Sequence, residues 1–368
     1  MVAASRLQIN TAVKHGAIKG RGTALQPPNR FDRERVEAFH DGWDLPEEVE
    51  KPRTTLMRDA TKTIIARNDS PDLHFDRSIN PYRGCEHGCV YCFARPSHAY
   101  LGLSAGLDFE TKIIFKPEAP RLLEKELSRP SYKPGTIVLG SNTDPYQPVE
   151  RTLGITRSVL EVLERFNHPV SIITKSAGVL RDADILARMA AKNLAQVHLS
   201  ITTLDPVLAR AMEPRAASPA RRLAAISDLA QLGIPAGVLA SPMIPGVNDA
   251  ELETILETAA KAGATSAYSL LLRLPHELGQ LFTDWLNQYL PERAAHVLSL
   301  IRQSRAGQLN DPNFHSRFTG KGPYAELLTQ RFERAARQFG LDGRRTELDT
   351  SLFCIPHAAR EVLQMDLF

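Results

Sequence analysis

The sequence has few cysteines and no long apolar run. Only four of its 368 residues are Cys, and aromatic residues make up 7%. No uninterrupted apolar run approaches the roughly 18 residues that a membrane-spanning helix needs, so we expect no membrane contact. The first 20 residues scatter Arg6, Lys14 and Lys19 among short apolar pieces. They lack the apolar core of a secretory signal, which predicts a cytoplasmic protein.

The excess of positive over negative charge is also small. The formal net charge is +3 and the pI is about 8.6. That mild excess permits a nucleic-acid partner but does not indicate one. The chain is 43% hydrophobic and 24% charged, which excludes wholesale disorder and a coiled coil. Its length suits two to three domain-sized units, or one barrel of roughly 200–250 residues with extensions.

The chain divides into three predicted parts. Residues 1–76 read as a polar leader with too little apolar periodicity for its own core, so we expect it to wrap the next domain; within it only residues 61–65 read as a possible strand. Later, short apolar runs alternate with helical periodicity. Strands are predicted at 136–140, 170–174, 196–202, 236–239 and 265–272, and helices at 155–166, 179–192, 221–232 and 250–262.

This alternation predicts βαβ units and a parallel sheet. The fold class is therefore α/β, with a partial (β/α)6 TIM-like barrel over residues 77–275, since a full eight-fold barrel needs roughly 250 residues. The alternation stops after Pro275. Residues 276–368 are expected to form a helical C-terminal extension, with helices at 277–304 and 324–339.

Three of the four cysteines lie close together, at Cys85, Cys89 and Cys92, in a stretch that also holds Gly84 and Gly88. A four-iron cluster normally takes four Cys ligands. With three thiols at this spacing, one iron would remain for a non-protein ligand. A disulfide framework would instead spread an even number of cysteines along a short secreted chain.

The alternative is a zinc site of three Cys and one His, using His74, His87 or His98. Zinc loops usually carry paired C-x2-C units separated by a dozen or more residues. That pairing is absent from this chain. The cluster interpretation is therefore favoured over zinc.

The C-x3-C-x-aromatic-C spacing, with Tyr91 as the aromatic residue, resembles the signature of the radical S-adenosylmethionine (SAM) superfamily. The resemblance implies a partial (β/α)6 barrel, a [4Fe–4S] cluster held by Cys85, Cys89 and Cys92, and SAM on the remaining iron. Reductive cleavage of SAM would give a 5′-deoxyadenosyl radical that abstracts a substrate hydrogen. Electrons would come from a reductase such as flavodoxin or ferredoxin.

The resemblance covers roughly residues 77–275. Within it, the sequence is similar to the spore photoproduct lyase or DNA repair photolyase-like branch. It is carried by residues 140–150, 173–176, 198–203 and 241–249. It implies SAM contacts from residues that follow predicted strands: Ser141 and Asp144 near the amino group, Lys175 at the carboxylate, Ser200 at the carboxylate or ribose, and Tyr91 and Met243 near the adenine. The alternatives are helix N-caps for the two serines and core packing for Tyr91.

One feature departs from that branch. Spore photoproduct lyase returns a hydrogen to its product from a cysteine beside the motif after the second strand, and residues 138–141 here contain no thiol. Cys354 is distant and lies between Phe353 and Ile355, which predicts a buried, inert side chain. Thymine-dimer reversal by the same mechanism is therefore not expected.

The C-terminal region supplies two partner hypotheses. Residues 302–345 interleave Arg and Lys with Phe314, Phe318 and Tyr324, a pattern that suits phosphates and unstacked bases, although a solvated helix face is the alternative. The final residues, Gln364, Met365, Asp366, Leu367 and Phe368, resemble the bacterial sliding-clamp-binding pentapeptide. The alternative is a tail folded back onto its own domain.

The sequence thus leaves several functions open. The favoured one is a radical SAM enzyme, lyase-like in its resemblance, acting on nucleic acid in a reaction related to DNA repair. A radical SAM enzyme with a protein or small-molecule substrate is an alternative. A non-enzymatic iron–sulfur or zinc protein that binds nucleic acid is the other.

Overall fold

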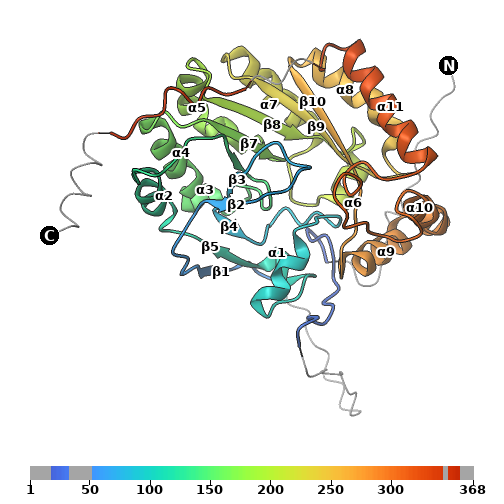
Figure 1. Cartoon of the computed structure of the whole chain (residues 1–368). Helices are drawn as coiled ribbons and strands as arrows, with labels where there is room; N and C mark the ends of the chain where they lie inside the picture. Colours follow the sequence, from blue (N-terminus) through green and yellow to red (C-terminus); the bar gives the residue numbers. More distant parts are fainter. Residues whose placement is uncertain (1–17, 33–51, 343–346, 357–368) are drawn as a thin grey trace.

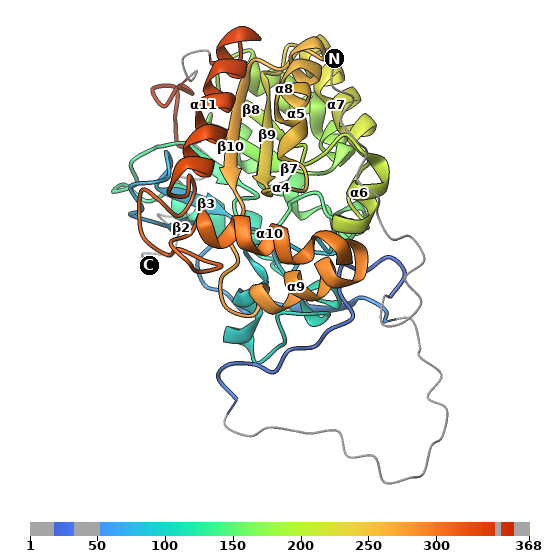
Figure 2. The same cartoon turned by 90° about the vertical axis from the view of Figure 1, so that its right-hand side faces the viewer.

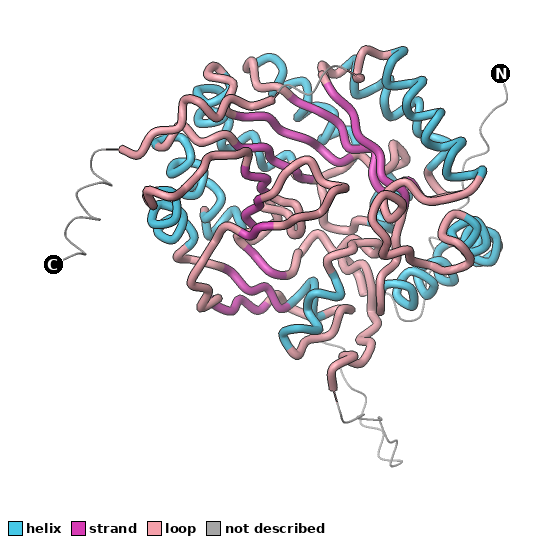
Figure 3. The backbone as a smooth tube through the Cα atoms, in the orientation of Figure 1, coloured by secondary structure: helices cyan, strands magenta, loops and turns pink. Residues whose placement is uncertain are grey.

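The computed structural model describes residues 18–32, 52–342 and 347–356. A seven-stranded sheet, in the order β10-β9-β8-β7-β6-β3-β2, forms its centre. Six of these strands are parallel: β3 (Arg77–Ile79), β6 (Ile137–Leu139), β7 (Val170–Thr174), β8 (Ala195–Ser200), β9 (Ala236–Met243) and β10 (Ser266–Leu271). The order is linear, so these six strands form an open, partial barrel, and the predicted fold class is confirmed (Figures 1 and 3).

Helices cover the outer face of this sheet. They include α4 (Ile155–Arg165), α5 (Ala183–Ala190), α7 (Pro219–Gln231) and α8 (Leu252–Lys261). The last helix, α11 (Pro323–Gln338), packs on α8 and β10 at the edge of the sheet (Figure 2). The apolar faces of these helices and the buried strand residues form one core, because parallel strands are covered on both faces.

The remaining elements are a small second sheet, one short edge strand and several short helices. A small second sheet has the order β1-β5-β4. Its strands are β1 (Thr55–Arg58), β4 (Tyr82–Arg83) and β5 (Lys112–Phe115), and β2 (Ala66–Arg67) pairs antiparallel with β3. The short helices are η1 (Arg95–Leu101), α1 (Asp108–Thr111), α2 (Ala119–Leu127), α3 (Glu150–Leu153), η2 (Ala177–Asp182), α6 (Pro206–Met212) and η3 (Asp249–Glu251).

After β10 come α9 (Leu278–Tyr289) and α10 (Pro291–Gln303). Figure 2 shows this pair at the carboxyl ends of β9 and β10. The single helix expected over 277–304 is thus two helices, because Pro291 lacks a backbone N–H and begins a new one. None of the helices in the described part of the chain is long and apolar enough to cross a membrane.

The five predicted barrel strands and the four helices between them are confirmed, apart from boundary shifts. The strand predicted at 61–65 is wrong, since the leader strands are β1 and β2 on either side of it. The first barrel strand, β3, was missed because two of its three residues, Arg77 and Ser78, are polar, so it shows no apolar run of the kind that marks the equally short β6. β5, α2 and α6 were missed as well.

A candidate cluster site at the carboxyl ends of the strands

The sequence-predicted residues gather at one edge of the parallel sheet. Ser141 follows β6, Lys175 follows β7, Ser200 ends β8 and Met243 ends β9. Since neighbouring parallel strands end at the same edge, the loops after them meet there. The cysteine-bearing loop, residues 84–92, follows β3 and β4 at that edge.

Two glycines and a few backbone hydrogen bonds shape the cysteine loop. Gly84 and Gly88 have φ of +80° and +68°, in the left-handed region that favours glycine. The N–H of Cys85 donates to Phe109 O at 2.9 Å, and the N–H of Cys92 donates to Cys89 O at 3.2 Å. The loop therefore turns tightly, and its three thiols lie within one short segment of the chain.

The three thiols suit an iron–sulfur cluster. Cys85 and Cys89 are buried and Cys92 is half-buried, and none is in a disulfide. Burial raises the pKa of Cys85 and raises that of Cys89 to about 12, so a bound cation is needed to hold them as thiolates. Among the described residues, no three His, Cys, Asp or Glu side chains converge on one metal ion. A [4Fe–4S] cluster does not require three ligands around one metal ion, because each iron takes a single thiolate.

Two of the three histidines in the zinc alternative, His87 and His98, each have a ring nitrogen close to another group of the protein. The Nε2 atom of His98 lies 3.1 Å from Lys112 O, and the ring packs edge-on against Phe109. The Nδ1 atom of His87 lies 3.3 Å from Asp144 Oδ2. The buried positions of these rings follow from packing, and they do not complete a tetrahedral zinc set with the cysteines.

A buried ion pair between Arg95 and Glu110, which the sequence did not reveal, supports the cysteine loop. Arg95 donates to Glu110 at 2.5 Å, to Cys89 O at 2.8 Å and to Gly88 O at 3.1 Å. Both charged side chains are fully buried. Glu110 also accepts from the N–H of Gly22 in the leader at 2.9 Å. The pair therefore joins the leader, η1 and the cysteine loop into one structure.

A second buried network lies around Tyr91. The Tyr91 hydroxyl donates to Glu213, which also accepts from Arg222 and, at 2.6 Å, from Thr202. Burial alone would raise the pKa of Glu213, but Arg222 and Lys175 outweigh it and lower that pKa to about 2. Glu213 and Arg222 were missed because they lie outside every quoted motif and are far from Tyr91 in sequence.

Lys175 stands beside this network with its ammonium group unpaired. Its Nζ atom lies 5.9 Å from the centroid of the Tyr91 ring. Within the part of the chain that the structure describes, it makes no hydrogen bond and no ion pair, whereas its backbone N–H donates to Asp144 Oδ2 at 2.7 Å. A half-buried cation held in place by its backbone is available to an anionic ligand group.

Asp144 and Ser141 differ in how many hydrogen bonds their side chains already make. Asp144 is saturated by Thr174, Tyr146 and Lys175, and His87 beside it helps lower its pKa to about 2 against the opposing effect of burial. Ser141 accepts one long bond, 3.4 Å, from Asn80. Neither Ser141 nor Ser200 caps a described helix, so the alternative role as N-caps is wrong.

Met243 is 1% exposed and packs in the main core. The turn after it is held by Asn248, whose side chain accepts from the N–H of Ile244 at 2.6 Å and donates to Thr202 O at 2.6 Å. Asn248 thus connects the ends of β8 and β9. Its role was not predicted, although it lies in the quoted stretch 241–249.

Cys354 corrects an expectation. It is exposed, not buried, because the apolar residues on either side, Phe353 and Ile355, turn inward to pack against the core. Its N–H donates to Phe166 O at 3.0 Å, just before β7 begins. Cys354 therefore lies at the amino edge of the sheet, opposite the edge that carries the cysteine loop.

Three basic residues of the C-terminal segment are paired with acidic side chains within the protein. Arg317 forms an ion pair with Asp72 at 2.6 Å, Arg331 with Glu253 at 2.7 Å and Lys321 with Asp311 at 3.2 Å. Arg305 is buried. Arg344 and Arg345 lie outside the described residues, as do the five residues of the clamp-like tail, Gln364 to Phe368.

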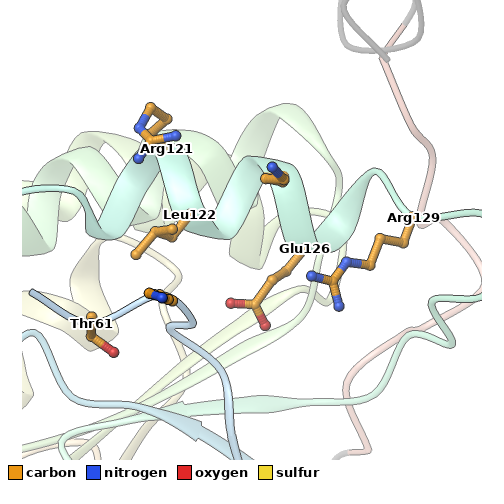
Figure 4. A pocket seen from close by; sticks show the side chains of 7 residues that line it. Thr61, Arg121, Leu122, Glu126 and Arg129 are labelled. Atoms are coloured by element: carbon orange, nitrogen blue, oxygen red, sulfur yellow. The ribbon is translucent and has the colours of Figure 1, made fainter. Parts of the chain in front are cut away.

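A hollow of 320 Å³ lies away from this edge, between α2 and the leader (Figure 4). It is lined by Thr61, Lys62, Arg121, Leu122, Lys125, Glu126 and Arg129. Its acid, Glu126, accepts from the N–H of Ile64 at 2.5 Å. It contains none of the cysteines or predicted SAM contacts, so it is not the reaction site.

Known proteins resemble this chain in sequence and in fold. The family profile of the radical SAM superfamily matches residues 79–259. Uncharacterized protein Mb2609c of Mycobacterium bovis is 35% identical over 233 residues, which cover 63% of this chain and 68% of the relative. Uncharacterized protein MJ0683 of Methanocaldococcus jannaschii is 30% identical over 173 residues, covering 47% and 62%.

Among solved structures, spore photoproduct lyase complexed with dinucleoside spore photoproduct matches with a TM-score of 0.56 and 16% identity, over 77% of this chain and 79% of that one. A variant of the lyase with bound AdoMet and dinucleoside spore photoproduct matches with a TM-score of 0.55 and 15% identity, over 77% and 78%. At this identity the likeness shows the fold alone.

The family match agrees with the site built above. Radical SAM proteins use a [4Fe–4S] cluster and SAM, and three thiols on one loop beside an unpaired lysine fit that pair of cofactors. The chain belongs to the radical SAM superfamily, is a radical SAM enzyme, and has the fold of spore photoproduct lyase.

Proposed function

We propose that this radical SAM enzyme abstracts hydrogen from a nucleic acid. One observation carries the substrate class: the basic and aromatic C-terminal segment meets the cysteine loop, where Arg273 lies over both Phe93, next to Cys92, and Phe318. The solved lyase complex holds a dinucleoside photoproduct on the same fold, which supports the proposal.

In this proposal Cys85, Cys89 and Cys92 hold the cluster. When bound, the cluster and SAM supply a 5′-deoxyadenosyl radical to the substrate. Lys175 pairs with the SAM carboxylate, since its ammonium is otherwise unpaired. Ser141 and Ser200 offer hydroxyls to the amino acid and ribose parts, Tyr91 and the turn after Met243 flank the adenine, and Asp144 positions Lys175 through its backbone N–H.

The proposed reaction differs from that expected of spore photoproduct lyase itself. No thiol follows β6, and the chain's remaining cysteine, Cys354, lies at the opposite edge of the sheet. A cysteine of this chain therefore has no path by which to return hydrogen to a product at the cluster edge. We expect another fate for the product radical than return of hydrogen from a cysteine.

Two protein partners belong to this proposal. A flavodoxin- or ferredoxin-type reductase would supply the electron. The tail from Gln364 to Phe368 would dock on the bacterial sliding clamp as an extended peptide, with Leu367 and Phe368 as its apolar anchors. Capture of the chain on immobilised clamp, with and without residues 364–368, tests this; equal capture would rule the tail out as the docking element.

The substrate class is tested with anaerobically reconstituted enzyme, reductant and SAM. Single-stranded and double-stranded DNA and RNA, deuterated on sugar and base, are supplied in turn, and deuterium in 5′-deoxyadenosine is measured by mass spectrometry. Transfer from a nucleic acid is the expected result. Cleavage of SAM with no deuterium transfer from any of them would overturn the proposal and favour a protein or small-molecule substrate.

A further inference from the structure

Five side chains form a continuous stack at the cluster edge of the sheet. The guanidinium of Arg273, just after β10, lies 5.1 Å from the ring centroid of Phe93 and 5.4 Å from that of Phe318. The guanidinium of Arg317 lies 4.7 Å from Phe318 and 4.8 Å from Phe314. We name Phe93, Arg273, Phe318, Arg317 and Phe314 the stacked surface. It begins one residue after Cys92.

The outer rings of the stacked surface face solvent. Phe93 is 44% exposed and Phe314 is 51% exposed. Large exposed aromatic side chains lose apolar stabilisation that burial would give. Two of them, each with a guanidinium on one side, leave flat apolar rings exposed beside the site where the chemistry takes place.

The backbone beneath the stacked surface is rigidly held. Buried Arg305 donates to Ser316 O at 3.0 Å and Arg317 O at 2.8 Å, and on its other side to Leu271 O at 2.9 Å and Leu272 O at 2.7 Å. It therefore ties the loop of Phe314, Arg317 and Phe318 to the end of β10. A surface ordered before binding loses less entropy when a ligand arrives.

The two arginines of the stack differ in charge balance. Arg317 is neutralised by Asp72 of the leader, at 2.6 Å. Arg273 has no ion pair and no hydrogen bond with any residue that the structure describes, and it lies over the rings of Phe93 and Phe318. Burial and the charge of Arg317 lower its pKa, and the Asp72 carboxylate opposes them in part. A half-buried guanidinium between aromatic rings, with no ion pair of its own, can bind an anion.

We propose that the stacked surface binds an unpaired stretch of the nucleic-acid substrate, with Phe93 and Phe314 stacking on bases and Arg273 contacting a backbone phosphate. This inference rests on the proposed function. It adds that the nucleic acid is single-stranded where it binds, and it names the residues that bind it. Unpaired bases present their faces to aromatic rings, whereas the bases of a duplex are already stacked on one another. The surface then delivers the strand to the edge that carries the cysteine loop.

The test measures binding of fluorescein-labelled oligothymidylate, and of a duplex of the same length, to the reconstituted enzyme by fluorescence anisotropy at several salt concentrations. Wild type is expected to prefer the single strand. Phe314→Ala should weaken binding about fivefold to a hundredfold, the usual effect of losing one stacked base, while Phe314→Trp should retain it. Arg273→Gln should lower the slope of log K against log salt by about 0.7.

Arg121→Gln is the control, because Arg121 is an exposed arginine in the hollow beside α2. It should bind as wild type does. Iron content and unfolding midpoint are measured for every variant, so that a folding defect is not mistaken for lost binding. Equal binding by wild type, Phe314→Ala and Arg273→Gln would overturn the stacked surface, as would a preference for duplex.

Deuterium transfer from nucleic acid, measured on the same preparations, keeps this inference separate from the proposed function. If transfer persists while the variants bind normally, the stacked surface is overturned and the substrate class stands. If wild type neither binds the oligonucleotides nor takes deuterium from them, both are overturned.

Discussion

Cys85, Cys89 and Cys92 differ from Cys354 in the edge of the sheet that they occupy. The first three lie on the loop at the carboxyl edge, and Cys354 is exposed near the amino edge. Spacing along the chain already separated the three from the one. The structure adds that an exposed thiol at the far edge has no access to the proposed reaction.

We therefore predict that Cys92→Ser loses the cluster, because a hydroxyl does not replace a thiolate as an iron ligand. The expected result is a fall from about four irons per chain to well below half of that, together with loss of SAM cleavage. Cys354→Ser is the matched control and should retain both. Iron analysis after anaerobic reconstitution checks this, and full iron in Cys92→Ser would refute the ligand assignment.

Glu213 is the residue on which the buried polar network depends. It receives hydrogen bonds from Tyr91, Thr202 and Arg222, and both it and Arg222 are 1% exposed. Removing one partner of a buried ion pair leaves the other charge uncompensated. Because both side chains are shielded from solvent, we expect the Glu213–Arg222 pair to contribute more to stability than an exposed ion pair does.

Glu213→Gln is predicted to lower the free energy of unfolding by about 3 kcal/mol. Glu164→Gln is the control: Glu164 pairs with Arg188 on the exposed surface, and such pairs contribute little. Urea unfolding of both variants under identical conditions makes the comparison. Similar losses in the two would mean that Arg222 finds another partner in the Glu213 variant.

At the scale of elements, the described leader segment 18–32 packs against the cysteine loop. Gly22 is so close that a Cβ atom there would lie 1.7 Å from Gly88 O. Arg21 donates to Glu110 O at 2.9 Å, next to the bond between the Gly22 N–H and the Glu110 carboxylate. The leader thus forms part of the wall behind the cluster ligands.

We predict that Gly22→Ala displaces this segment, because its methyl group and Gly88 O cannot occupy the same space. Overpacking of this kind costs about 1–3 kcal/mol. Iron should be lost faster on exposure to air, and limited proteolysis should cut the leader sooner. Gly20→Asn is the control, since nothing lies within 4 Å of its Cβ position and Asn tolerates a positive φ. Equal rates of iron loss in the two variants would contradict the prediction.

At the scale of the whole molecule, two buried histidines make the fold sensitive to acid. Burial lowers the pKa of His168 and of His198 to about 4, from an ordinary value of 6.5. The unfolded chain therefore binds more protons than the folded chain between these values. Stability is complete above about pH 6.5 and falls as the pH drops toward 4.

The predicted loss at pH 5.5 is about 1.4 kcal/mol for each histidine. Urea midpoints at pH 7.5 and 5.5 measure it. His198→Gln, which cannot take up the proton, should show a smaller difference between the two pH values than wild type by about that amount. An unchanged difference would mean that His198 stays neutral in both folded and unfolded states, or is charged in both.

The regular parts of the fold were predictable because their signals are local. The alternation of apolar runs and helical periods gave β6 to β10 and the helices between them, and each of these elements shows its period within its own residues. β3 is as short as β6 but has two polar residues among its three, and it showed no apolar run. Pro291 is visible in the sequence, yet the prediction placed a single helix over 277–304 across it.

The candidate site divides in the same way. The spacing of Cys85, Cys89 and Cys92 and the strand-end positions of Ser141, Lys175 and Ser200 were legible without a structure. Arg95 with Glu110, and Tyr91 with Glu213, were not. The second pair lies 122 positions apart, and no local pattern records which distant charge a buried group will meet.

By itself the sequence determined the cofactor loop, the parallel sheet and the edge at which they meet, because ligand spacing and hydrophobic period are properties of neighbouring residues. Tertiary structure decided that Cys354 faces solvent at the opposite edge, that Arg317, Lys321 and Arg331 are paired with acidic side chains, and that Arg273, which precedes that segment, forms no ion pair with any described residue. The physical reason is that burial and charge pairing depend on which segments pack together, and packing joins residues that lie far apart in the chain.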